Sequence, residues 1–181
     1  MKPLKSLVSA IICILFSFQT FAQDEAKMKL KKTTFDKLQP SELVNKLYNY
    51  IFEKKAAHIP LNKGQQAIYY ISKINEEIAS VGFVDFFLKN KGKFNQGGLD
   101  GLELIGDSLS YNILNRAVEI YQENESIFAE TDPDLESSRF RTINQKLELE
   151  TSEYTAKEKK RDIILSNYIK RHHSMFVNFT D

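Results

Sequence analysis

The sequence predicts an all-α fold, a single compact domain of about six or seven helices that follows a signal peptide. Apolar residues recur at spacings of three and four over most of the chain after residue 40, which is typical of amphipathic helices. No alternating apolar and polar run bounded by turn signals predicts a strand. No motif of about 20 to 50 residues repeats, which argues against a solenoid.

Residues 1–22 have the parts of a secretory signal peptide. Lys2 and Lys5 precede an apolar run over 7–21, and a small-x-small site ends at Ala22, after which cleavage is predicted. The run is shorter than the roughly 20 residues that span a bilayer as a helix. We therefore expect an exported protein, periplasmic or extracellular, with no stable membrane insertion after cleavage. An uncleaved anchor or a buried helix is the alternative.

Cleavage would change the charge and the cysteine content. The formal charge falls from +1 to −1, because two lysines leave and no acid does, so global charge predicts neither nucleic-acid binding nor attraction to a membrane. The only cysteine, Cys13, lies in the apolar run. A mature chain without cysteine excludes disulfides, thiolate catalysis and cysteine-ligated metals.

The domain is predicted to span residues 40–173, between a flexible, polar, lysine-rich lead-in at 23–39 and a tail at 174–181. Its first helix should begin at Pro40 with Ser41 as the cap and end near residue 57. Asn62, with Gln65 three residues later, forms a capping-box pattern for the second helix. Gly82 marks the end of that helix or a sharp turn.

An aromatic block follows over residues 83–90, where Phe83, Phe86 and Phe87 recur at helical spacing and can be buried together. Residues 91–98 are expected to form a glycine-rich loop. A brief helix with Leu99, Leu102 and Ile105 should then stop at Gly106. The next helix, over about 107–121, is capped by Asp107 or Ser108.

The last third is predicted to contain a connection and two helices. Residues 122–137 form the connection, with Ile127 and Phe128 anchored inside. One helix should run from about residue 134 to 150. Thr155 is expected to cap the final helix, whose last turn carries Lys170 and Arg171, where the helix dipole favours cations.

Three stretches carry a resemblance to a known family: GFVDFFLKN at 82–90, GLELIG at 101–106 and ILNRA at 113–117. They resemble a bacterial helical domain family named for DNA-mimic proteins. The resemblance extends over roughly residues 40–172. Where members have an Asn-Gly-Gly step, this chain has Ser80-Val81-Gly82. The resemblance implies the helical fold, while DNA mimicry is a property of acidic, cytosolic members, and this chain is near neutral and expected to be exported.

The strongest local charge feature is an acidic segment at 119–136 that contains no lysine or arginine. A mimic needs carboxylates arrayed like phosphates, so the segment is our candidate surface for an unknown, basic protein partner; a solvated helix end and loop is the alternative. Its acids are Glu119, Glu123, Glu125, Glu130, Asp132, Asp134 and Glu136.

No other pattern predicts a catalytic, cofactor or metal site. The acids at 132–136 lack the glycine and glutamate that a calcium loop needs. The glycines at 92–101 lack the Gly-Lys-Ser/Thr ending of a phosphate loop. His58 is remote in sequence from the adjacent His172 and His173, which point in different directions on a helix. Carboxylate pairs such as Glu76 with Glu77 and Glu103 with Asp107 are expected to be surface charges.

We therefore expect a non-catalytic binding domain that needs no cofactor and does not bind nucleic acid. An immunity or inhibitor protein that neutralises a basic toxin in the envelope is one form of this function. The alternatives are an envelope hydrolase and a small-ligand binder, whose pocket would be lined by Phe86, Phe87, Tyr69 and Tyr70, although an aromatic stripe at helical spacing is also typical of a core. The sequence leaves the oligomeric state open.

Overall fold

The computed structural model describes residues 27–130 and 137–180, so the predicted signal peptide lies outside the described residues. The all-α prediction is confirmed, with eight α-helices, one short 3-10 helix and little strand in this part of the chain. The elements are β1 (Met28–Lys31), α2 (Lys32–Lys37), α3 (Pro40–Ala56), α4 (Lys63–Asn90), α5 (Asn95–Ile105), α6 (Ser108–Glu123), α7 (Glu125–Ala129), α8 (Ser138–Thr155), α9 (Glu158–Arg171), η1 (His173–Met175) and β2 (Val177–Thr180).

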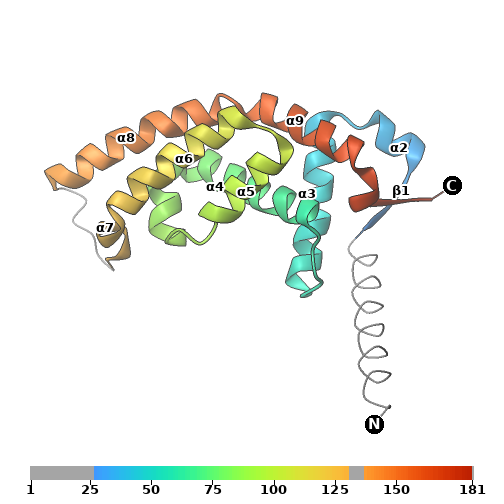
Figure 1. Cartoon of the computed structure of the whole chain (residues 1–181), viewed down its shortest axis with the longest axis horizontal. Helices are drawn as coiled ribbons and strands as arrows, with labels where there is room; N and C mark the ends of the chain where they lie inside the picture. Colours follow the sequence, from blue (N-terminus) through green and yellow to red (C-terminus); the bar gives the residue numbers. More distant parts are fainter. Residues whose placement is uncertain (1–26, 131–136, 181) are drawn as a thin grey trace, which may run out of the picture.

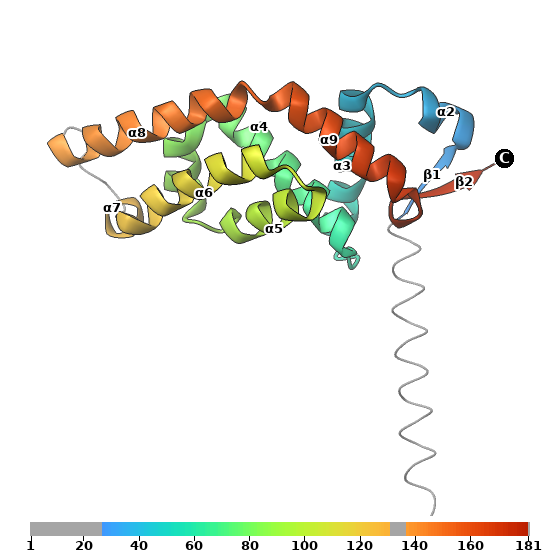
Figure 2. The same ribbon diagram turned by 45° about the horizontal axis from the view of Figure 1, so that its top comes forward.

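The helices form two packed layers. Helices α8 and α9 follow one another along one side of the molecule, and α4, α5 and α6 lie beneath them (Figures 1 and 2). Helix α8 packs on both α4 and α6, while α9 packs on α3. Within residues 27–130 and 137–180, no helix combines the length and the apolar character needed to cross a membrane.

The two ends of the described chain pair as parallel strands, which the sequence did not predict. Met28 lies opposite Val177 and Lys31 opposite Thr180. The expected irregular lead-in therefore contains β1 and α2, and the expected tail contains η1 and β2. Phe35 of α2 is buried, and its ring meets the edge of Phe179 at 5.4 Å. Strands of four residues are too short to reveal an alternating pattern.

The helix starts follow local capping chemistry. The Asn62–Gln65 capping box of α4 is confirmed in both directions. Helix α3 does begin at Pro40, but its cap is Gln39, which forms a capping box with Glu42, so the prediction of Ser41 as the cap is wrong. The predicted cap of α6 is confirmed, since the side chain of Asp107 accepts from the Ser110 N–H at 3.1 Å.

Gly82 is a kink inside α4 rather than its end. Its backbone angles are φ 75° and ψ 176°, a conformation that glycine adopts without a Cβ penalty. The kink frees the N–H of Phe83, which donates to Thr151 Oγ1 on α8 at 3.0 Å. Helix α4 thus changes direction where it meets α8.

The expected loop over 91–98 ends earlier than predicted, because Asn95 already begins α5. Gly97 and Gly98 are helical, and they allow α5 to approach α4 closely. A Cβ on Gly98 would lie 2.2 Å from Ile74 Cδ1, and one on Gly97 would lie 2.6 Å from the ring of Tyr70. These glycines serve packing rather than a turn.

Two boundaries near the end also differ from prediction. Helix α8 is capped by Ser137 and continues to Thr155, so the predicted end at residue 150 is wrong; its predicted start near 134 lies outside the described residues. Thr155 does not cap α9, because its hydroxyl donates back to the carbonyl of Thr151 at 2.8 Å. Helix α9 begins at Glu158, after Lys157 as its cap.

The predicted aromatic block forms the centre of the core. Phe83, Phe86 and Phe87 are fully buried, and Phe87 stacks on Tyr121 at 4.7 Å. Phe128 of α7 is also buried against the Phe87 ring, at 6.0 Å, so the anchoring predicted for the 122–137 connection is confirmed for this residue. The core therefore continues from α4 through α6 into α7.

Three charged residues are buried where the sequence suggested solvated charges or gave no signal. Asp107 and Glu77 are 3% and 7% exposed, so both are wrong as expected surface charges. Arg161 is 1% exposed, and its guanidinium lies 3.9 Å from the centre of the Tyr154 ring. It also donates to the Ser110 hydroxyl at 3.3 Å and to the Tyr154 carbonyl at 3.1 Å.

Candidate partner-binding surface

The described part of the acidic segment lies at the end of the molecule where α6 and α7 meet (Figure 1). Glu119 and Glu123 belong to α6, Glu125 begins α7, and Glu130 directly follows α7 as its cap residue; all four are exposed. Asp132, Asp134 and Glu136 lie outside the described residues. The described acids of the segment thus lie on two helices or, for Glu130, directly after one.

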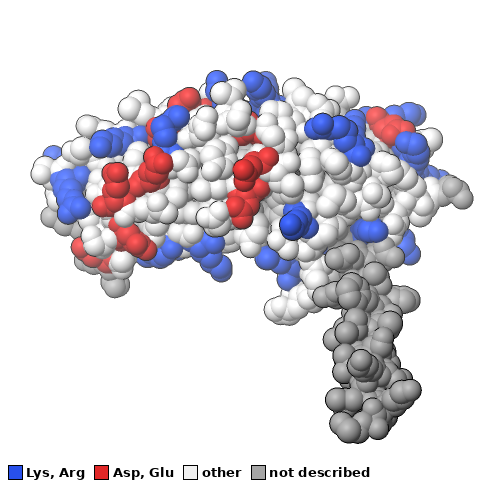
Figure 3. Space-filling view, in the orientation of Figure 1, with Lys and Arg blue, Asp and Glu red and all other residues white. Residues whose placement is uncertain are grey.

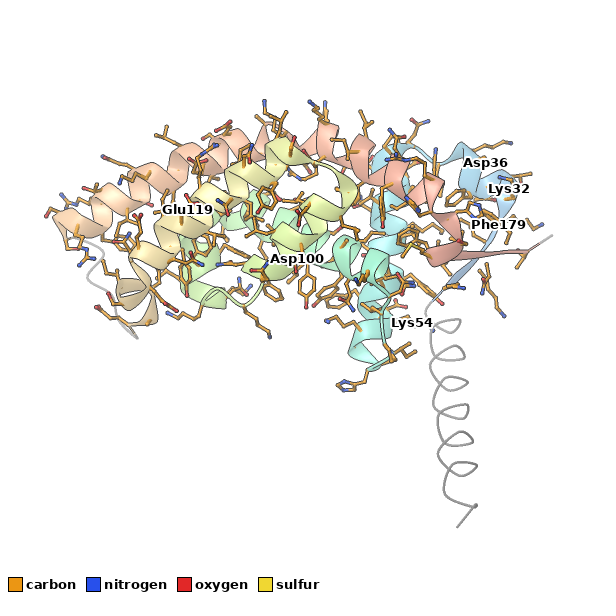
Figure 4. The ribbon with its side chains drawn as sticks, in the orientation of Figure 1. Lys32, Asp36, Lys54, Asp100, Glu119 and Phe179 are labelled. Atoms are coloured by element: carbon orange, nitrogen blue, oxygen red, sulfur yellow. The ribbon has the colours of Figure 1, made fainter. Side chains whose placement is uncertain are left out.

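Helix α5 adds carboxylates to the same face. Figure 4 shows Asp100 and Glu119 on one side of the molecule, and Figure 3 shows acidic side chains gathered over α5, α6 and α8, with basic ones between them. Gln96 Nε2 donates to Asp100 Oδ1 at 2.6 Å, and Asn115 Nδ2 donates to Glu119 Oε1 at 2.7 Å. Each pair spans one helical turn, so an amide holds each carboxylate in place.

The sequence analysis did not include Asp100, although a glutamine four residues before an aspartate on a helix indicates that the two side chains can form a hydrogen bond. It also missed a charge cluster between α6 and α8. Arg116 donates to both carboxylate oxygens of Glu150, at 3.0 and 2.8 Å, and to Glu153 at 2.6 Å. The hydrogen bond to Glu150 is the main cause that raises the pKa of Arg116. Two carboxylates on α8 thus surround one guanidinium, and this cluster keeps an excess of negative charge.

A groove of about 510 Å³ runs between α5 and α6 beside Glu119 and Glu125. Asn95, the first residue of α5, lines this groove and is only 7% exposed. Tyr121 and Glu125 both line the groove, and burial, followed by the charge of Glu125, raises the pKa of the Tyr121 hydroxyl. The ammonium of Lys91 donates to the carbonyls of Phe128 and Glu130 at the end of α7.

A second groove of about 820 Å³ follows the kink of α4 along α8. Asp85, Glu148 and Glu158 line it, and no lysine or arginine is among its lining residues. The sequence did not indicate this groove, because its acids come from three separate helices. Within the described ranges, no three His, Cys, Asp or Glu residues come together in a way that could hold a metal ion.

The histidines and the paired tyrosines have structural surroundings. His172 lies on the ring of Tyr168 at 4.6 Å, and His173 on the ring of Phe179 at 5.1 Å. Tyr69 is buried, while Tyr70 is half-buried and lines a groove of about 620 Å³ beside α5. On the face formed by α5, α6 and α7, the exposed carboxylates can accept hydrogen bonds from cationic groups of another molecule.

The family model of the DMP19-like proteins matches residues 60–172 of the chain. This match covers more than half of the sequence, and the chain belongs to the DMP19-like family. It confirms the resemblance to the DNA-mimic family seen in the motifs between residues 82 and 117. The matched residues run from the start of α4 to the end of α9, so they include the whole face described above. No curated protein and no solved structure matched the chain.

Proposed function

We propose that this DMP19-like protein is an exported, non-catalytic helical domain that binds a basic partner protein through its acidic surface. We define the acidic surface as Asp100, Glu119, Glu123, Glu125 and Glu130. The observation that carries the proposal is that these exposed carboxylates lie on or at the ends of neighbouring helices, and that amide side chains hold Asp100 and Glu119 in place. The three undescribed acids at 132–136 belong to the same proposed segment.

Helix-borne carboxylates suit the imitation of a charged polymer. A protein that binds a nucleic-acid backbone presents lysine and arginine side chains to regularly spaced phosphates. Carboxylates on rigid helices can occupy the same cations without a large loss of side-chain entropy, and their field increases the rate of encounter. Such binding weakens as salt concentration rises.

Export follows from the signal-peptide pattern of residues 1–22. It would place the partner in the envelope or outside the cell, so an immunity or inhibitor role against a basic toxin is a specific form of this function. A hydrolase and a small-ligand binder are the alternatives, and a hydrolase would need catalytic groups with perturbed pKa values inside a cleft.

The test is affinity capture followed by measurement with the purified captured partner. The test variant of this protein combines Glu123→Lys with Glu125→Lys. The matched control combines Glu53→Lys on α3 with Asp85→Lys on α4, and Glu53 and Asp85 are both exposed in the structure. We expect the affinity of the test variant for the partner to fall at least about tenfold, equivalent to 1.4 kcal/mol, while the control binds like wild type. Wild-type binding should also fall with added salt.

Equal binding by both variants, or binding that salt does not weaken, would overturn the assignment of the acidic surface. In the same preparation, the mass of the envelope protein tests export directly. We expect a chain that begins at Gln23, and a full-length chain confined to the cytoplasm would contradict export.

A further inference from the structure

Among the described residues, the side-chain oxygen of Asn95, a buried residue that lines the groove between α5 and α6, has no hydrogen-bond partner. Asn95 is 7% exposed, and no donor among the described residues reaches its Oδ1 atom. A buried polar atom without a partner destabilises the folded state, because it has lost its hydrogen bonds to water and gained none in return. Asn95 also lines the groove, so a ligand that enters there can supply the missing donor.

The charges around the groove select for a cation. Glu119 and Glu125 both line it, and Asn115 Nδ2 holds only the Oε1 atom of Glu119. The one lysine among the lining residues, Lys91, directs its ammonium at the carbonyls of Phe128 and Glu130. Two carboxylates and one engaged ammonium leave the groove with a net negative charge, which disfavours a phosphate or carboxylate ligand.

We propose that this groove takes the side chain of an arginine from the partner protein, a proposal that rests on the proposed function and names what the surface recognises. A guanidinium carries five N–H donors in a fixed planar fork, whereas a lysine ammonium is a compact point charge. Acceptors from three elements surround the groove, namely Asn95 on α5, Glu119 on α6 and Glu125 on α7. Several separate acceptors around one groove match a planar fork of five donors better than a compact ammonium.

The walls of the groove suit the rest of the arginine side chain. Leu99 and Val118 line it together with Tyr111, and these side chains can cover the methylene stem while the guanidinium reaches the acceptors. The volume of about 510 Å³ leaves ample room for one such side chain.

The test compares octa-arginine with octa-lysine, two labelled peptides of equal charge, by fluorescence anisotropy at the same salt concentration. We expect the wild-type protein to bind octa-arginine about tenfold more tightly, equivalent to 1.4 kcal/mol. Asn95→Leu should abolish this preference and leave octa-lysine binding unchanged, because it removes the acceptor without changing the charge. Asn95→Asp keeps an acceptor of the same shape, so it should retain the preference even if Asn95→Leu folds poorly.

Glu119→Gln should weaken octa-arginine binding more than octa-lysine binding. The matched control is Glu123→Gln, one helical turn further on α6 and not a groove residue, which should weaken both peptides equally. Equal affinity of wild type for the two peptides, or a preference that survives both Asn95→Leu and Glu119→Gln, would overturn the arginine site. If both peptides bound equally and Glu123→Gln weakened both, the arginine site would be wrong but the acidic surface would still bind cations. The proposed function itself would fail only if the charge-reversed variant bound the captured partner as well as its control does.

Discussion

Replacement of Gly98 by alanine is a direct test of the packing between α4 and α5. Gly98 is buried, and an added Cβ would lie 2.2 Å from Ile74 Cδ1 and 3.1 Å from Leu114 Cδ2. Ile74 and Leu114 are themselves fully buried, so neither can rotate into solvent to make room. Either a core side chain leaves its preferred rotamer or α5 moves away from α4.

Two opposing effects set the magnitude. Alanine is favoured over glycine inside a helix by about 0.8–1.0 kcal/mol. One extra methyl group in a packed core costs about 1–3 kcal/mol, and the 2.2 Å contact places this site at the upper end. We therefore expect the free energy of unfolding to fall by about 1–2 kcal/mol. For a chain of this size, each kcal/mol lowers Tm by about 2–4 °C.

Urea unfolding followed by the helical circular dichroism signal measures this change. Ile74→Val removes the Cδ1 atom that the new methyl group meets, so the double variant should lose less stability than the two single variants together, by about 0.5 kcal/mol or more. Gly106→Ala is a control with φ +79° and no atom within 4 Å of its added Cβ, so its loss should not depend on Ile74. A Gly98→Ala variant that is stabilised by about 1 kcal/mol, as in a solvent-exposed helix, would refute this packing argument.

Two further predictions concern α4 and its contacts. Thr151→Val removes the hydroxyl that accepts from the Phe83 N–H at the kink, so unfolding free energy should fall by about 1–3 kcal/mol in urea titrations, and an unchanged midpoint would contradict the role of that hydrogen bond. Burial opposes ionisation of Glu77, but hydrogen bonds from Lys73 and Asn90 outweigh it and hold its pKa below the usual value. A lowered folded-state pKa adds stability at neutral pH that is lost as pH falls through that value. Glu77→Gln should therefore lower the unfolding free energy at pH 7. The difference in unfolding free energy between variant and wild type should shrink as the pH falls below the usual pKa of a carboxyl group. A difference that does not change with pH would contradict this reasoning.

The fold class and most helix positions were predictable because their signals are local. Asn62 with Gln65, and Asp107 with Ser110, satisfy backbone groups within three residues, so their spacing is visible in the sequence. The apolar spacing of the aromatic block likewise placed its three phenylalanines in the core. Errors arose where two local choices were similar, as for Gln39 and Ser41, or where glycines suggested a loop but serve close helix packing at Gly97 and Gly98.

The candidate site was predictable only in part. The density of acids after residue 118 pointed to α6 and α7, since charge density requires no knowledge of the fold. It could not reveal that Asp100 shares this face, or that Arg116 pairs with Glu150 and Glu153, because those partners come from other helices. The buried state of Asn95 has no sequence signal at all.

The sequence by itself determined that this chain forms amphipathic helices around an aromatic centre, and the motifs at 82–117 indicated the family. Capping, helix periodicity and charge density act over a few residues, and such effects can be read directly from the chain. Only the tertiary structure decided that Met28 pairs with Val177, that Gly98 is a contact point between two helices, and that a groove between α5 and α6 is lined by Asn95, whose side-chain oxygen has no partner among the described residues. Those features depend on which distant residues come into contact, and contact is set by the packing of whole helices.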